Sequence, residues 1–196
     1  MTSRQLQPRP HLLAHTTVVT AFLALVGCLG LTTAGASAAA ASPYCGITWG
    51  SLARAGSVET GPVLTGVRTG RHDCYDRLVL DLRGGASAGF HVGYVDDVYR
   101  DASGELVPLQ GGARLQVVVH ASSFDMGGHP TFTPSNPSQL ANVAGYTTFR
   151  QVAYAGSFEG QTSVGLGVRA RLPFRAFVLA GPGDGSRLVV DVAHRW

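Results

Sequence analysis

Lysine is absent from the sequence, and all 15 cations are arginine. Charged residues make up only 14% of the chain and hydrophobic residues 45%, so the composition excludes a disordered, charge-rich segment. The missing lysine also excludes a coiled coil or long charged helix, which needs a repeating pattern of leucine, alanine and charged residues. Glycine is abundant, with 26 residues in a chain of 196. That length favours a single domain.

The first 41 residues have the composition of a secretory signal peptide. Arg4 and Arg9 form a basic start, an apolar run spans 18–31, and residues 36–38 supply an A-x-A cleavage site. The apolar run is shorter than the ~20 residues that a membrane span needs. The sequence therefore predicts a signal peptide over 1–41 and an exported chain.

The same segment permits a second interpretation. Residues 25–28 resemble a bacterial lipobox, in which Cys28 is lipidated and becomes the first residue of the mature protein. Acyl chains on Cys28 would hold the protein at the outer face of the plasma membrane. In both interpretations the chain contacts the membrane only through its leader or a lipid anchor.

The charge of the exported chain depends on this leader. The full sequence has a net charge of +3 and a pI of about 9.0. The leader contains two arginines and no acid, so its removal lowers the net charge by two, to +1. A nearly neutral domain lacks the basic surface that binds a phosphate backbone, and we therefore expect no nucleic-acid partner.

Cysteine is scarce, and only Cys45 and Cys74 lie beyond the leader. In an oxidising compartment such a pair typically forms a disulfide. A zinc pair or a reactive thiol is the competing interpretation, but neither cysteine has the C-x-x-C spacing typical of those sites. We expect a disulfide that ties an N-terminal extension, residues 42–63, to a domain spanning 64–196.

Apolar and polar residues alternate with a period of two through most of this domain. Within residues 77–82, for example, three leucines share one face while Arg77 and Asp81 share the other. Glycine-rich turns separate such runs, and no segment has the period of an α-helix. These features predict an all-β fold, an antiparallel β-sandwich or barrel of about six to nine short strands. The alternating runs are 77–82, 90–95, 115–119, 164–168, 174–179 and 188–192.

One run occurs twice, as RLVLDL at 77–82 and as RLVVDV at 187–192. Two half-buried strands of similar composition can look alike by coincidence. The repeat equally fits two neighbouring strands that close one sheet. In that arrangement an arginine of one strand lies opposite the aspartate of the other.

Two short motifs match catalytic or cofactor-binding patterns, but their surroundings do not. Residues 85–89 match the G-x-S-x-G nucleophile elbow around Ser87, yet a strand rather than the required helix follows. Residues 165–170 match G-x-G-x-x-A, yet their glycines alternate with apolar residues inside a strand instead of turning into a helix. Glycine in a strand indicates the close approach of another backbone or a bend.

Residues 124–142 contain three prolines, which predict a long loop rather than a central strand. Asp125 and His129 lie four positions apart within it. A cell-wall hydrolase that uses carboxylates or His129 near this loop is an alternative function for the chain. A zinc hydrolase needs three converging ligands, however, and the sequence supplies no third ligand beside this pair. No motif predicts a metal or a cofactor.

Arginines cluster in the last third of the chain. Arg169 and Arg171 are predicted to share one face of a strand, Arg175 follows shortly after, and Arg150 precedes another strand. These four are either a solvated outer face or a shallow groove for an anionic ligand, because guanidinium groups bind carboxylates bidentately. Nearby aromatic residues are candidates for stacking on sugars or for packing in the core. They are Tyr146, Phe149, Tyr154 and Phe158.

Several longer blocks resemble the AMIN-like domain of exported actinobacterial proteins. The resemblance implies a small all-β sandwich without catalytic residues of its own, in a protein that is exported and often lipid-anchored. The sequence is also, more distantly, similar to AMIN modules, which target proteins to the cell envelope by holding peptidoglycan. The blocks are 45–52, 67–79, 158–162, 167–175 and 187–194.

These observations together predict an exported, non-enzymatic domain of the cell envelope that binds peptidoglycan through an arginine-bearing face. A wall hydrolase and a protein-binding surface lipoprotein are the two alternatives. A concave site gathering Asp125 and His129 would favour the hydrolase. A large exposed apolar patch would favour the protein-binding lipoprotein.

Overall fold

The computed structural model describes residues 43–56 and 61–196; the predicted signal peptide and its lipobox at Cys28 lie outside these residues. The described chain is all-β, as predicted, with eleven strands and one short 3-10 turn at Tyr44–Gly46. Eight strands have six or more residues, within the predicted range, and three have only two. The strands are β1 (Arg54–Ala55), β2 (Val63–Arg71), β3 (Tyr75–Arg83), β4 (Phe90–Val95), β5 (Val98–Tyr99), β6 (Leu106–Val107), β7 (Ala113–Val119), β8 (Phe149–Phe158), β9 (Gln161–Val168), β10 (Phe174–Ala180) and β11 (Ser186–Ala193).

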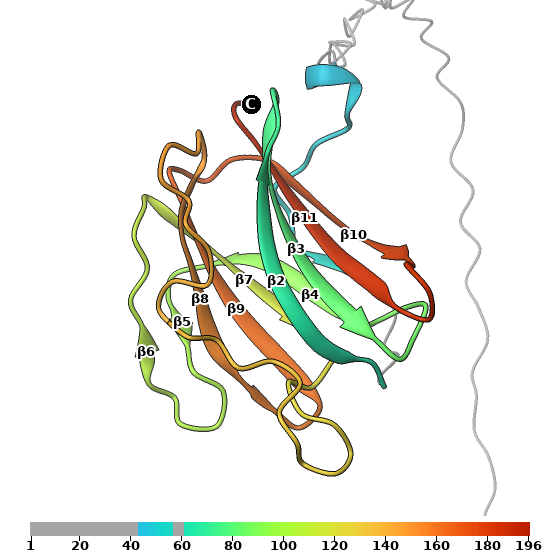
Figure 1. Cartoon of the computed structure of the whole chain (residues 1–196). Helices are drawn as coiled ribbons and strands as arrows, with labels where there is room; N and C mark the ends of the chain where they lie inside the picture. The colour runs from blue at the N-terminus through green and yellow to red at the C-terminus, as the bar shows by residue number, and fades with distance from the viewer. Residues whose placement is uncertain (1–42, 57–60) are drawn as a thin grey trace, which may run out of the picture. The chain divides into compact units, whose positions relative to one another are not determined.

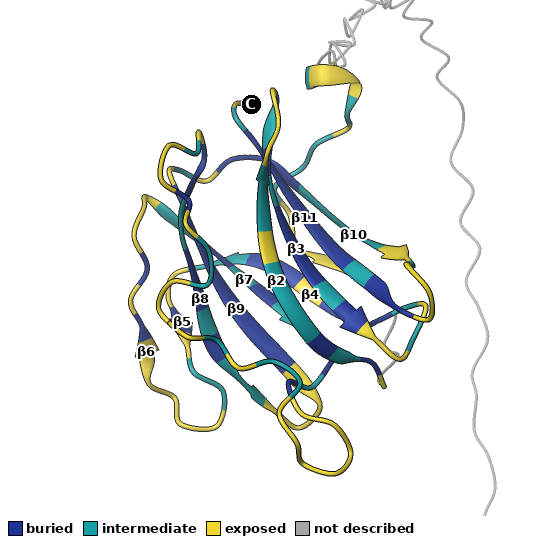
Figure 2. Cartoon of the chain, in the orientation of Figure 1, coloured by how far each residue is buried: buried dark blue, intermediate teal, exposed yellow. Residues whose placement is uncertain are grey.

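Two antiparallel sheets face each other (Figure 1). One has the strand order β1-β4-β7-β9-β8, and the other has the order β10-β11-β3-β2. Leucines and valines from both sheets fill the space between them, and the buried positions lie along the central strands (Figure 2). The predicted alternation of leucines in β3 is confirmed, because Leu78, Leu80 and Leu82 all lie in this core. The architecture is the predicted β-sandwich.

The short strands β5 and β6 form a hairpin on the outer side of the first sheet (Figure 1). Their apolar residues pack with Ala153 and Ala155 of β8 in a second, smaller core. Gly165 and Gly167 of β9 lie beneath this region, and a Cβ at Gly167 would overlap the carbonyl oxygen of Gln110. The glycines of the G-x-G-x-x-A match therefore permit a close backbone approach, as predicted, and do not form a dinucleotide site.

The repeated RLVLDL and RLVVDV segments are neighbouring strands. β3 and β11 pair antiparallel, with Asp191 opposite Arg77 and Arg187 opposite Asp81. The hypothesis that the two segments close one sheet is confirmed. Antiparallel pairing explains the motif, since an arginine followed four residues later by an aspartate meets its mirror image across the ladder.

The proline-rich loop at 124–142 contains no strand, as predicted, and it covers an edge of the first sheet. Its Leu140 donates a backbone hydrogen bond to Val152 of β8 (2.8 Å), and Tyr154 of β8 donates one to Pro137 (2.7 Å). Edge strands with unpaired backbone groups promote aggregation, so natural proteins cover or blunt them. The contacts of this loop give it a structural role.

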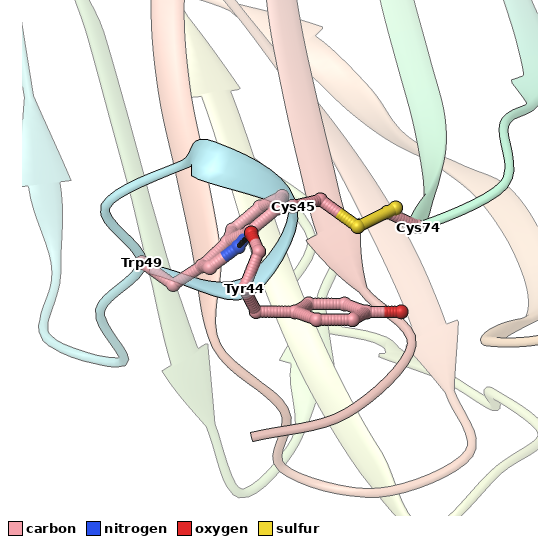
Figure 3. Close-up of a disulfide and its surroundings, with 4 residues drawn as sticks. All are labelled: Tyr44, Cys45, Trp49 and Cys74. Atoms are coloured by element: carbon pink, nitrogen blue, oxygen red, sulfur yellow. Dashed lines mark hydrogen bonds between the residues drawn. A yellow bond between two sulfur atoms is a disulfide. The ribbon is translucent and has the colours of Figure 1, made fainter. Parts of the chain in front are cut away.

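The N-terminal segment closes the opposite side of the sandwich. Gly50 accepts a backbone hydrogen bond from Phe174 of β10 (2.7 Å), and β1 pairs with β4 of the other sheet. The expected disulfide is present: Cys45 is bonded to Cys74, which lies in the turn between β2 and β3 (Figure 3). A segment that touches both sheets is thereby anchored to one of them.

We expect replacement of both bridge cysteines, Cys45→Ser with Cys74→Ser, to lower the free energy of unfolding by about 3.5 kcal/mol. This value follows from the loop-closure entropy of cysteines 29 positions apart in the sequence. Urea unfolding of the oxidised protein and the double variant measures it. A reducing agent should destabilise only the unmodified protein. A loss below about 1 kcal/mol would contradict the prediction.

Candidate functional site

The outer face of the β10-β11-β3-β2 sheet carries an unusual set of side chains. Because side chains alternate between the two faces of a strand, the leucines of β3 point into the core while Arg77 points outward. Register places Arg175 of β10, Asp191 of β11 and Arg77 in one row across the sheet. We call the surface around this row the arginine–aromatic face. It consists of Trp49, Tyr75, Arg77, Arg175, Phe177 and Asp191.

The centre of this face is a buried carboxylate held by two arginines. The Asp191 side chain is fully buried, and Arg77 donates to both of its oxygens at 2.6 and 2.9 Å. Arg175 binds the same carboxylate through Nε at 2.8 Å and a terminal nitrogen at 2.7 Å. The hydrogen bond to Asp191 raises the pKa of the Arg77 guanidinium above its usual value. One negative charge thus fixes two cations side by side.

Three aromatic rings surround these guanidinium groups. The Arg175 guanidinium carbon lies 5.5 Å from the ring centres of Trp49 and Tyr75 and 5.1 Å from that of Phe177. Arg77 lies over the same Tyr75 ring at 5.2 Å. Cation–π contacts of this kind hold a guanidinium in a defined plane. Both arginine side chains nevertheless remain partly exposed, at 23% for Arg77 and 31% for Arg175.

Beside the first row, a second row of charged side chains extends across β2, β3 and β11. Arg68 of β2 forms a bidentate pair with Asp81 at 2.8 and 3.0 Å, and this hydrogen bond raises the pKa of Arg68. Arg187 lies opposite Asp81 in register, but its nearest bonded partner is the carbonyl oxygen of Ala180 (3.4 Å). Four arginines therefore accompany two aspartates over the two rows, and the sheet face is electropositive.

The structure does not bring the four predicted arginines together. Only Arg175 belongs to the arginine–aromatic face. Arg150, the second residue of β8, bonds the nearby carbonyl oxygens of Tyr146 and Phe149.

The strand predicted to carry Arg169 and Arg171 was placed wrongly. β9 ends at Val168, and Arg169 makes only one further backbone hydrogen bond, to the carbonyl oxygen of Thr148 (2.8 Å). Arg169 binds the carbonyl oxygen of His194, while Arg171 stacks on Tyr94 at 4.7 Å.

The four aromatic residues that were candidates for stacking on sugars or for packing in the core serve mostly in packing. Phe149 is buried in the main core, and Tyr146 stacks on it at 5.9 Å. Tyr154 bonds Ser123 through its hydroxyl (2.9 Å), and Phe158 alone of the four is half exposed. The partly buried rings of the arginine–aromatic face were missed. Their signal lay in the alternation, since Phe177 and Tyr75 fall on the outward positions of amphipathic strands.

The segments that match catalytic patterns have ordinary structural roles. Ser87 lies in the loop between β3 and β4, and no helix follows it. The Asp125 carboxylate accepts the backbone N–H groups of Gly127 (2.8 Å) and His129 (2.9 Å) and lies 3.2 Å from the His129 ring. These bonds, first of all the backbone one from His129, lower the pKa of Asp125. Over the described ranges, no group of three histidine, cysteine or acidic side chains is placed to hold a metal.

Two facing antiparallel sheets around one core make the described chain an all-β sandwich domain. The model of the AMIN-like domain family matches residues 62–194, and the chain belongs to this family. Membership indicates a cell-envelope-related module with an envelope or extracellular location. No curated protein and no solved structure matches the chain. Within 43–56 and 61–196, no helix has the length and apolarity to cross a bilayer.

We expect Asp191→Ala to lower the free energy of unfolding by about 3 kcal/mol, since it leaves two arginines without their shared buried carboxylate. Asp81→Ala is the matched control from the same repeated motif. Its partner Arg68 is 56% exposed, so the expected loss is below about 1 kcal/mol. Chemical denaturation measures both. Equal losses for the two variants would show that the burial of Asp191 adds nothing to its contribution to the free energy of unfolding.

Tyr94, which lies beneath Arg171, should ionise at a higher pH than an ordinary tyrosine. Its hydroxyl donates to the carbonyl oxygen of Leu172 (2.6 Å), and burial raises its pKa to about 12. The unfolded value is about 10, so stability from the neutral phenol is present below pH about 10 and is lost as pH rises toward 12. Absorbance titration should show a phenol ionising near pH 12 that Tyr94→Phe removes.

Proposed function

We propose that the chain is an exported, non-enzymatic module that binds peptidoglycan through the arginine–aromatic face. The observation that carries this proposal is the pair of partly exposed arginines that share one buried carboxylate on an electropositive sheet face. The predicted signal peptide would deliver the domain to the envelope, and lipidation of Cys28 would keep it there.

The chemistry of the ligand matches this face. Peptide stems of peptidoglycan present carboxylates, and a planar guanidinium binds a carboxylate through two parallel hydrogen bonds. Each guanidinium has five N–H donors, so Arg77 and Arg175 retain donors after binding Asp191. Their partial exposure leaves those donors accessible to an anion from solvent.

The aromatic rings favour binding by fixing the arginines before a ligand arrives. A free arginine side chain loses rotamer entropy when it binds, and this loss weakens affinity. Here Asp191 and the rings of Trp49, Tyr75 and Phe177 already hold the guanidinium groups. The face therefore requires little rearrangement to accept a carboxylate.

Arg175→Ala should weaken binding to purified cell-wall sacculi about tenfold, the loss expected when one charge-assisted hydrogen bond is removed. Arg77 still holds Asp191 in this variant, so the fold should survive, and thermal unfolding checks that it does. Co-sedimentation of the protein, produced with its own leader, measures the apparent Kd. Added salt should weaken binding further.

Arg114→Ala is the matched control, because Arg114 has a similar exposed fraction (33% against 31%) and lies on β7 of the other sheet. It should bind as the unmodified protein does. Arg169→Ala with Arg171→Ala tests whether the loop arginines contribute instead. Equal recovery with and without sacculi would overturn the proposed function, and an unchanged Kd for Arg175→Ala would overturn the proposed face.

A further inference from the structure

A hollow of about 390 Å³ adjoins the arginine–aromatic face and contains both tryptophans of the chain. The residues before β1, the residue before β10 and the last residue of the sequence form its walls. We call it the aromatic hollow. It is lined by Pro43, Tyr44, Ile47, Thr48, Trp49, Pro173 and Trp196.

Bonds that the fold already makes hold part of the wall of the hollow. The Trp49 indole donates to the carbonyl oxygen of Tyr44 (2.9 Å), and the adjacent Cys45 is bonded to Cys74 (Figure 3). Pro173 accepts a backbone hydrogen bond from Ala193 (2.9 Å) at the end of β11. Tyr44, Trp49 and Pro173 are thus held in place before any ligand arrives, as the residues of most ligand sites are.

Two cations lie beside its rings. The guanidinium carbon of Arg195 lies 4.5 Å from the Tyr44 ring centre, and that of Arg175 lies 5.5 Å from the Trp49 ring centre. Trp49 therefore belongs both to the hollow and to the arginine–aromatic face. A ligand that fills the hollow can place an attached anionic group on Arg175 without a gap between the two sites.

We propose that the aromatic hollow binds a pyranose ring of an envelope glycan, while the arginine–aromatic face binds a carboxylate attached to the same strand. The inference rests on the proposed function and names the part of the polymer that each surface holds. One side of a pyranose ring is a plane of C–H groups, which packs on the negative face of an aromatic ring. The ring hydroxyls can accept hydrogen bonds from the guanidinium group of Arg195, which lies beside the Tyr44 ring.

A sugar fits this hollow better than an acyl chain does. An acyl chain needs a closed apolar cavity, whereas Trp196 is 71% exposed and Thr48 opens the rim to water. Flat rings with cations at their edges suit a flat ligand with polar groups around its circumference.

The two tryptophans make the hollow directly observable. Since both line it, a change in tryptophan emission on adding a ligand reports on this hollow or on the adjoining arginine–aromatic face, to which Trp49 also belongs. The probe is the tetrasaccharide of N-acetylglucosamine, which has neither carboxylate nor peptide. We expect a saturable change in emission. A linear response or none would overturn the inference, as would saturable displacement of the sugar by a short-chain fatty acid.

Trp196→Ala should weaken tetrasaccharide binding about tenfold, and Trp196→Phe, which keeps a ring, should retain most of it. The exposure of Trp196 makes both variants compatible with the fold, and Trp49 remains to report binding. Phe158→Ala is the control, because Phe158 is a half-exposed aromatic residue on β8 outside the hollow. Equal binding by Trp196→Ala and Phe158→Ala would overturn the inference.

The variants separate this inference from the proposed function. Arg175→Ala should weaken binding to sacculi far more than binding of the tetrasaccharide, because the probe has no carboxylate for Arg175 to bind. Trp196→Ala should weaken both. Sacculus binding that depends on Arg175 but not on Trp196 would leave the proposed function standing and overturn the sugar site. Sugar binding without sacculus binding would overturn the function proposed for the sheet face.

Discussion

The fully buried carboxylate of Asp191 is the constraint on which the exposed face of the sandwich depends. A buried charge is tolerated only when it is paired and hydrogen-bonded, and Arg77 and Arg175 satisfy that requirement from the two neighbouring strands. Two cations so close together repel each other, and the carboxylate between them offsets this repulsion. The aromatic rings of Trp49, Tyr75 and Phe177 then cover the ion cluster and keep it partly dry.

The N-terminal segment links this cluster to the rest of the fold. Trp49 reaches Arg175 because Gly50 bonds to Phe174 at the start of β10 and because Cys45 is tied to Cys74. The same segment continues to β1 at the edge of the other sheet. On the opposite side of the sandwich, the loop at 124–142 covers the edge strand β8. Both segments lack regular structure over most of their length, yet each satisfies backbone groups that a bare sheet edge leaves open.

The proposed binding surface uses the parts of an antiparallel sheet that the core does not need. Inward positions are committed to packing, whereas outward positions are free to carry arginine and aromatic residues. A sheet face is broad and shallow, which suits an extended polymer. The aromatic hollow adds a recess at one end of this surface, and Trp49 joins the two. The family, the charge and the position of the rings support the same envelope ligand.

Much of the fold could be predicted from the local sequence pattern alone, because a strand shows itself as an alternation of apolar and polar residues along consecutive positions. The outward Arg77 and Asp81, the disulfide, the proline-rich loop and the pairing of the two repeated segments all follow from short-range features and antiparallel symmetry. β2 was missed because a bulge between Leu64 and Gly66 breaks its alternation. Arg169 and Arg171 were misplaced because the alternation of apolar and polar residues continues past Val168, where β9 ends. The candidate site depends on tertiary structure: strand order places Arg175 beside Asp191, and chain folding brings Trp49 and Trp196 to one hollow, so neither contact has a local signal.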